Sequence, residues 1–210
     1  MFFPALLLAA SAIAVPGLGP TAVDYFLEKI DFRELARNGR WVGVTVNLWV
    51  EPNRRISRCS VGNFAGDEAS AKSICPMLIG MRTGLPRDGE GRKTYAYVTV
   101  PIIAIAASSM QGTEKLRQEF FALPIEGDPD ARLTLAGSSI SADDYFEIVV
   151  AVDTGGAVTA CGQRGKTRQD LGERACELAQ GRTFVVRRAD SGEPVPYVRN
   201  VKLISESSKP

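Results

Sequence analysis

The chain has 210 residues, of which 45% are hydrophobic and 23% are charged, so it can form one or two packed domains and is not a disordered chain. Its formal net charge is +1 and its basic residues are dispersed among acids, which excludes the clustered cationic surface that nucleic acids require. The densest basic run, residues 182–188, alternates with apolar residues and is typical of the solvated face of a strand. The chain contains no histidine, which excludes Ser-His-Asp and Cys-His catalysis and histidine-ligated metals.

Residues 1–22 carry no charged side chain and include a short apolar run. Residues 12–14, Ala-Ile-Ala, supply the small-x-small pattern of a signal-peptidase site, whereas Pro16 and Pro20 interrupt the continuous apolar helix of about 20 residues that a membrane span needs. We therefore expect a cleaved signal peptide and a periplasmic protein. The alternatives are an ordinary buried segment, or an uncleaved anchor that would hold the protein at the inner membrane facing the periplasm and give it its only membrane contact.

An internal repeat emerges when residues 46–59 are aligned with residues 148–161. Each segment reads as an apolar run, a turn containing Pro and Asn or Asp and Gly, and a second run that ends at a cysteine, which predicts two strands joined by a tight turn. A stretch of helix formers follows in both copies and carries the second cysteine, Cys75 or Cys176, sixteen or fifteen positions after the first. Both tryptophans lie in the first copy, so the copies have diverged.

Each copy closes with an acidic, glycine-containing turn and a further strand, residues 94–101 and 197–204. The order is therefore β-β-α-β in both, and the fold class expected is α+β, with two tandem units that each contain a small antiparallel sheet and a packed helix. Further helices are expected over residues 23–38 and 112–121, ahead of the first copy and between the copies.

The repeat sets the expected domain boundaries. The first unit, with its leading helix, covers residues 23–104, and the second covers residues 140–204. Residues 105–139 form a connector, and residues 205–210 a flexible tail.

The four cysteines are predicted to form one disulfide in each copy, Cys59–Cys75 and Cys161–Cys176. The repeated spacing favours this pairing because it joins a strand end to the following helix twice, and export would bring the chain to an oxidising compartment. A Cys₄ zinc site would need closer pairs, and a catalytic thiol would need a base. Two pairs of buried reduced thiols remain the alternative if the chain is not exported.

No side chains form a recognisable catalytic, metal or cofactor site. The candidate acid pairs for a small carboxylate-based hydrolase are Asp143 with Asp144 and Asp128 with Asp130. Both pairs lie in turn-rich sequence, where Asp caps backbone amides. Calcium binding by Glu126 with Asp128 and Asp130 would depart from an EF-hand loop at nearly every position. We therefore expect a protein that is not an enzyme and carries no cofactor.

The ordered motifs resemble the C-terminal domain of the energy transducer TonB, and most of all its cysteine-bearing periplasmic relatives. The second copy carries the resemblance through residues 150–153, 158–161 and 190–198 and through Cys176. The first copy contributes residues 38–46, which are similar to the Gly-x-Gly-x-Val entry into the family's first strand. Short strands and glycine turns are common in proteins, so it is their ordered recurrence that carries the resemblance.

The resemblance covers residues 31–101 and 140–204 and implies a periplasmic, non-enzymatic module that binds an extended segment of an envelope protein, such as an outer-membrane receptor, by adding a strand at a sheet edge. The long membrane helix and Pro-rich spacer of TonB have no counterpart here, so a membrane-anchored energy transducer for TonB-dependent transport is the alternative. The residues expected at the partner-binding edge belong to the last strand of each copy: Tyr97, Val98, Tyr197, Val198 and Val201.

Overall fold

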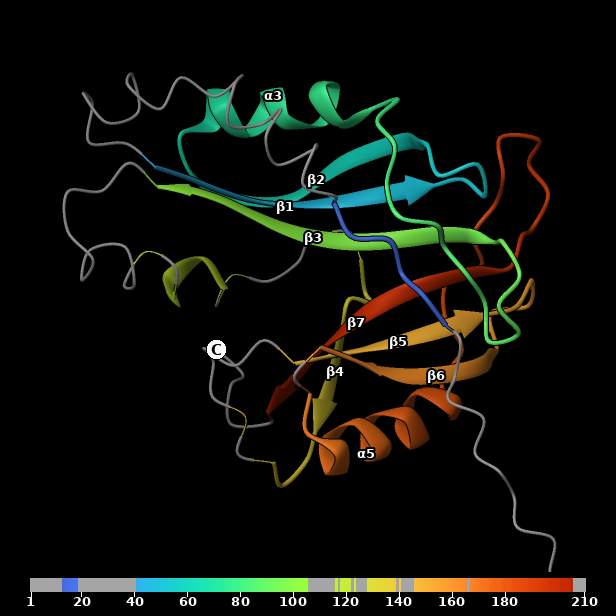
Figure 1. Cartoon of the computed structure of the whole chain (residues 1–210). Coiled ribbons are helices and arrows are strands. Elements are labelled where there is room, and N and C mark those ends of the chain that lie inside the picture. Colours follow the sequence, from blue (N-terminus) through green and yellow to red (C-terminus); the bar gives the residue numbers. More distant parts are fainter. Residues whose placement is uncertain are drawn as a thin grey trace, which may run out of the picture.

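The computed structural model of the chain describes residues 13–18, 41–105, 116, 118–121, 123, 128–138, 140, 146–165 and 167–205. The helix expected over residues 23–38 lies outside this part, as do Glu126, Asp143 and Asp144. Of the helix expected over residues 112–121, the described residues 116 and 118–121 are helical. The fold is α+β and is built on one mixed seven-stranded sheet (Figure 1).

The first half of the sheet is formed by β1 (Trp41–Val50), β2 (Ile56–Gly66) and β3 (Tyr95–Ile105), with helix α3 (Glu68–Leu78) between β2 and β3 in the chain. β1 lies in the middle and pairs antiparallel with both neighbours. Its residues from Val42 to Val50 are all buried, as expected of a strand covered on both faces.

The second half repeats this arrangement with β5 (Glu147–Val152), β6 (Val158–Arg164), α5 (Gln169–Gln180) and β7 (Tyr197–Ser205). β5 is the middle strand and again pairs antiparallel with both neighbours. The sequence pattern missed a strand between the halves, β4 (Arg132–Leu135), which runs parallel to β7. The segment expected to be a connector therefore belongs to the sheet.

The two halves join where β3 and β7 run parallel, from the pair Tyr95–Tyr197 to the pair Tyr97–Arg199. The main strand order is β2-β1-β3-β7-β5-β6, so the two small antiparallel sheets expected from the sequence form a single mixed sheet. Beyond the last backbone pair, the side-chain amide of Asn200 continues the junction: its Oδ1 accepts the N–H of Thr99 at 3.0 Å and its Nδ2 donates to the Thr99 carbonyl at 2.9 Å.

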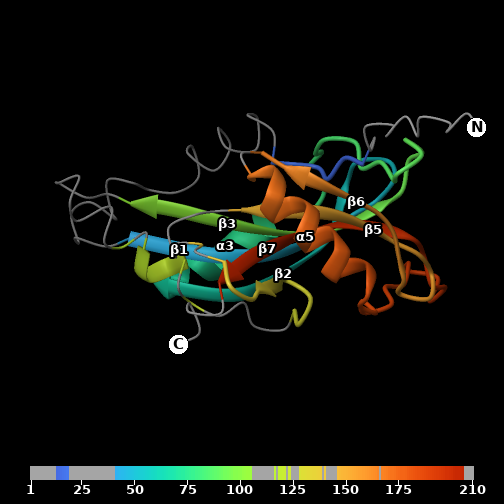
Figure 2. The same cartoon turned by 90° about the horizontal axis from the view of Figure 1, so that it is seen from below.

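The helices cover opposite faces of the sheet. Side chains alternate between the two faces along a strand, so neighbouring residues of β1 belong to different cores. The even-numbered residues of β1, such as Leu48, share one core with Ile74 of α3, whereas Trp49 belongs to the other core, with Leu171 of α5. Figure 1 shows α3 above β1 and β2 and α5 below β5 and β6, and in Figure 2, seen from below, α5 lies toward the viewer. Each helix thus covers only its own half of the sheet face on which it lies.

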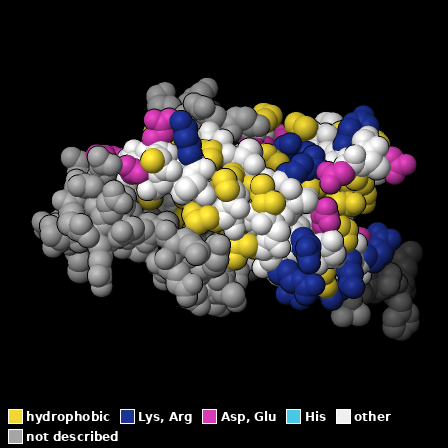
Figure 3. Space-filling view, turned by 90° about the horizontal axis from the view of Figure 1, so that it is seen from above, with side chains coloured by type: hydrophobic (Ala, Val, Ile, Leu, Met, Phe, Trp, Pro, Cys, Tyr) yellow, Lys and Arg dark blue, Asp and Glu magenta, His cyan; other side chains and the backbone are white. Residues whose placement is uncertain are grey.

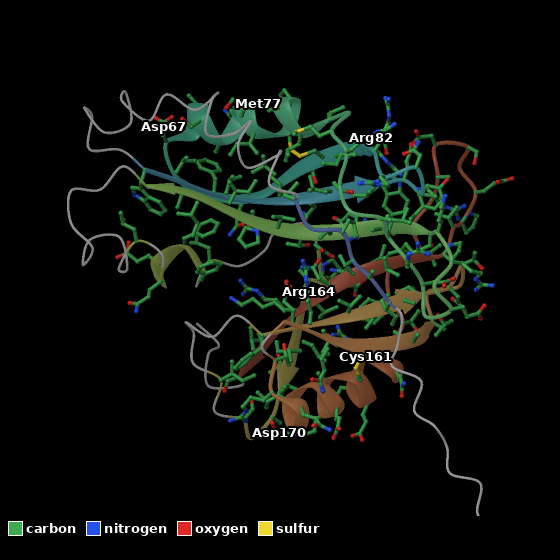
Figure 4. The ribbon with its side chains drawn as sticks, in the orientation of Figure 1. Asp67, Met77, Arg82, Cys161, Arg164 and Asp170 are labelled. Atoms are coloured by element: carbon green, nitrogen blue, oxygen red, sulfur yellow. A yellow bond between two sulfur atoms is a disulfide. The ribbon has the colours of Figure 1, made fainter. Side chains whose placement is uncertain are left out.

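Both predicted disulfides are present, and each ties an edge strand to the helix of its own half. Cys59 of β2 bonds to Cys75 of α3, and Cys161 of β6 bonds to Cys176 of α5. Figure 4 shows Cys161 on the side of β6 that faces α5. Two such bonds indicate an oxidising compartment outside the cytoplasm. Within the described residues, no helix combines the length and apolar character needed to span a membrane.

Candidate functional site

The residues predicted to form a partner-binding edge lie in the interior of the sheet instead. β3 is flanked by β1 and β7, and β7 is flanked by β3 and β5. The backbones of Tyr97 and Tyr197, for example, pair with a strand on each side. The prediction treated each copy as a separate sheet whose last strand is an exposed edge. In the structure these two last strands, β3 and β7, pair with each other in the parallel junction. The residues predicted for the edge, all of which belong to these two inner strands, are Tyr97, Val98, Tyr197, Val198 and Val201.

The sheet instead ends at β2 and β6, and no described strand pairs with the outer side of either. β2 is the longer edge, with 11 residues against 7 in β6. It also presents two exposed apolar side chains, Val61 and Phe64, at 37% and 41% exposure. An exposed edge strand of this length is the usual template for pairing with another chain.

A cleft of about 520 Å³ lies beside β2 on the sheet face that α3 does not cover. The register places its strand residues together: Trp49 pairs with Arg58, and Asn47 pairs with Ser60. We call it the arginine cleft. Its lining residues are Asn47, Trp49, Arg58, Cys59, Ser60, Tyr97, Arg187 and Arg188.

Two of these arginines lie against aromatic rings. The guanidinium of Arg58 is 4.9 Å from the centre of the Trp49 ring, and that of Arg187 is 3.7 Å from the centre of the Tyr97 ring. Arg58 also donates through Nη2 to the carbonyl of Arg188 at 2.7 Å. These contacts hold the cations in place on a face that is apolar beneath them.

Trp49 is the centre of an aromatic cluster at the junction of the halves. Its ring stacks on Tyr95 at 5.2 Å between centroids and meets Tyr97 at 6.5 Å and Tyr197 at 6.2 Å. Burial, reinforced by Asp128, raises the pKa of Tyr97 above its usual value, although Arg187 and Arg199 act the other way. The Tyr97 hydroxyl beside the arginine cleft is therefore neutral at pH 7.

The second half has a cleft at the equivalent place, on the opposite face of the sheet, with a volume of about 320 Å³. Ala151 pairs with Ala160 there, as Trp49 pairs with Arg58 in the first half. Its lining contains three acids and one arginine, Asp88, Glu90, Asp153 and Arg92. We call it the acidic cleft.

A buried ion pair lies next to the arginine cleft. Arg199 of β7 and Asp128 have fully buried side chains and form a bidentate pair, with Nη1–Oδ1 and Nη2–Oδ2 distances of 3.1 and 2.8 Å. Arg187 approaches the same carboxylate at 3.7 Å, and Asp130 lies 3.6 Å from Arg199 while it accepts the N–H of Val185 at 2.8 Å. Of the two candidate acid pairs, Asp128 with Asp130 lies in the described part of the chain. Arg187 and Arg199 balance its charges in a buried ion-pair network.

The basic run at residues 182–188 is the main signal that sequence reasoning misread. It was expected to be the solvated face of a strand, but the structure places it in the loop between α5 and β7, where Arg187 and Arg188 line the arginine cleft. Figure 3, seen from above, shows Lys and Arg side chains gathered at the end of the molecule where Figure 1 places this loop. Periodicity alone does not distinguish a strand from a loop that follows the sheet surface.

The described residues contain no group of three or more His, Cys, Asp or Glu side chains placed to hold a metal ion. Comparisons of the chain with models of known protein families, with curated proteins and with solved structures find no match.

Proposed function

We propose that the protein is a non-enzymatic protein-binding module of the cell envelope, which acts in the periplasm and resembles the TonB C-terminal domain in both halves. It recruits an envelope partner, of which an outer-membrane receptor segment is one example, by adding an extended segment of that partner to the edge strand β2. The observation that carries the proposal is the position of β2: in the described part of the chain no strand pairs with its outer side, where its first residue, Ile56, bonds to Gly80 and Met81.

Three further features support this function. Each half has the β-β-α-β order along the chain that the resemblance to a TonB-like unit implies. The two disulfides fit an oxidising compartment such as the periplasm. The strand β2 is also fastened to α3 through Cys59–Cys75, so its edge is held in an extended, preorganised shape for pairing.

Photo-crosslinking in living cells tests the site. A crosslinking amino acid at Phe64 of β2 should capture one defined envelope protein, which mass spectrometry identifies. The matched control is Leu178 on α5, the helix of the other half, which has a similar exposure of 47%. Equal capture from both positions, or none from Phe64, would contradict a binding edge at β2.

A membrane-anchored transducer is the second candidate, and one observation favours it. Ala14 pairs with Arg87 through two backbone hydrogen bonds of 3.0 and 2.9 Å, and Ile13, Val15 and Leu18 pack against the α3 core. Cleavage after Ala14 would remove both backbone hydrogen bonds and the packing of Ile13. Fractionation together with the intact mass of the mature chain separates the two candidates, since a retained N-terminus at the inner membrane supports the transducer and a shortened soluble chain excludes it.

A further inference from the structure

The arginine cleft is placed to contact every second residue of a strand added at β2. Arg58 and Ser60 are themselves alternate residues of β2, and both point to the face of the sheet that carries Trp49. An added strand would follow the same alternation, so its side chains on that face would lie over or beside the cleft.

The charge of the cleft favours an acidic guest. Among the described residues three arginines and no acid line it, and the charge of one of them, Arg187, is balanced by Asp128 behind the cleft. Arg58 has one carboxylate neighbour, Asp190, at 3.7 Å, but the two side chains are 52% and 71% exposed, so the pair is weak and can be displaced. Arg187 is more committed, because its guanidinium lies 3.7 Å from the buried carboxylate of Asp128 and its Nε is buried.

The rings beneath the cations add to this preference. Trp49 contacts the guanidinium of Arg58 by its face, so a guest carboxylate that displaces the exposed Asp190 can meet the planar edge of Arg58. Arginine in such a setting binds a carboxylate with a defined geometry, which a free lysine would not do.

The acidic cleft shows that this chemistry is not a general property of the repeat. At the positions of Trp49 and Arg58 the second half has Ala151 and Ala160, and acids surround them. A partner segment that suits the arginine cleft would therefore be repelled by its counterpart, which gives the two edges different specificities.

We propose that the arginine cleft reads acidic side chains, Glu or Asp, at alternate positions of the partner strand bound at β2. This inference rests on the proposed function and specifies the chemistry of the partner. The partner segment is extended, and one of its faces carries carboxylates that bind the two exposed arginines, Arg58 and Arg188.

Binding of three labelled peptides to the disulfide-bonded protein tests the inference. The peptides have the length of β2, 11 residues, and alternate valine with glutamate, glutamine or lysine. Fluorescence anisotropy at low ionic strength should show that the glutamate peptide binds about tenfold more tightly than the glutamine peptide and that the lysine peptide binds least. Added salt should reduce the difference. Equal affinities for the glutamate and glutamine peptides would overturn the inference.

Two variants and a second readout separate this result from the proposed function. Arg58→Ala reproduces the residue of the second half and should weaken the glutamate peptide about threefold to tenfold, whereas Arg92→Ala in the acidic cleft should leave the affinity unchanged. Hydrogen exchange of β2 in the same complexes reports strand addition. Protection of β2 with no preference for glutamate would contradict recognition of acidic side chains by the arginine cleft and support strand addition. A preference for glutamate without protection of β2 would contradict strand addition at β2.

Discussion

The two halves of the molecule share one topology and differ in the side chains at equivalent positions. Both have a central strand between two antiparallel neighbours, and both have a disulfide from the edge strand to the helix. The pair Trp49–Arg58 in the first half is Ala151–Ala160 in the second. The register also makes Arg199 the counterpart of Val98, because they pair with the equivalent residues Val150 and Leu48. Strand order and the disulfides are what the repeat retains, whereas the clefts and the junction have diverged.

Two halves of the same topology therefore present two different sheet edges, β2 and β6. The parallel junction uses the last strand of both copies, so each half has only its second strand left as an edge. Divergence of the residues beside these edges is then enough to give them separate binding properties. The following measurements test this comparison, from the largest expected effect to the smallest.

Removal of one member of the buried ion pair should be the most damaging single change. Arg199→Leu leaves the carboxylate of Asp128 buried next to an apolar side chain, which should lower the free energy of unfolding by about 3–5 kcal/mol in urea denaturation. The double variant Arg199→Leu with Asp128→Leu removes both charges and places an apolar residue where the first half has Val98. It should recover most of the lost stability. A single variant within about 1 kcal/mol of the parent chain would show that the pair is not needed.

The two disulfides should stabilise their halves to a similar degree. Replacement of Cys59 and Cys75 by alanine opens a loop of 16 residues, and replacement of Cys161 and Cys176 opens one of 15. Each should cost about 3 kcal/mol through the greater freedom of the unfolded chain. Urea denaturation of both double variants checks this, and a difference much larger than about 1 kcal/mol between them would mean that one half depends on its bond far more than the other.

Lys202 of β7 should make the stability rise with pH, an effect that its counterpart Pro101 in β3 cannot produce. Burial, reinforced by Arg132, lowers the pKa of Lys202 from 10.5 to about 8, although Glu147 acts the other way. Between these two values the unfolded chain binds more protons than the folded one, so the free energy of unfolding increases as the pH rises through this window. Lys202→Met should abolish the increase, whereas Lys72→Met, at an exposed site, should retain it. A slope that survives Lys202→Met would contradict the assignment.

The helix starts should give the smallest difference. Asp67 caps α3 by accepting the N–H of Ser70 at 2.9 Å, whereas Arg168 at the start of α5 makes no side-chain cap. Figure 4 shows Asp67 at the beginning of α3, and Asp170 marks the beginning of α5. Asp67→Ala should lower the free energy of unfolding by about 1 kcal/mol, and Arg168→Ser should raise it by up to that amount. Thermal unfolding of both variants measures this, and equal effects of the same sign would contradict it.

Local patterns in the sequence predicted the local structure well. The strand-turn-strand segments, the two helices and both disulfides occur where the repeat placed them, because alternation, helix formers and matched cysteine spacing act over short distances. The short β4 was missed, since four residues carry too little periodicity. Asp128 and Asp130 were expected to cap turns, and their pairing with Arg199 depends on contacts across more than sixty positions of the chain.

The edge was the main error, and it has a physical cause. A strand pattern states which residues face the core but not which backbone side remains unpaired, so the parallel contact between Tyr97 and Arg199 could not be inferred from either copy alone. The arginine cleft depends on the same contact, because Arg187 and Arg188 reach Tyr97 and Trp49 only when the second half lies beside the first.

Hydrogen exchange of the full chain, alone and in complex with the partner identified by crosslinking from Phe64, tests the proposed binding edge most directly. We predict slower exchange over β2, Ile56–Gly66, on binding, and little change over β6, Val158–Arg164, because backbone pairing occurs at the first edge only. Slower exchange over β6 with β2 unchanged, or no change in either strand in a saturated complex, would contradict strand addition at β2.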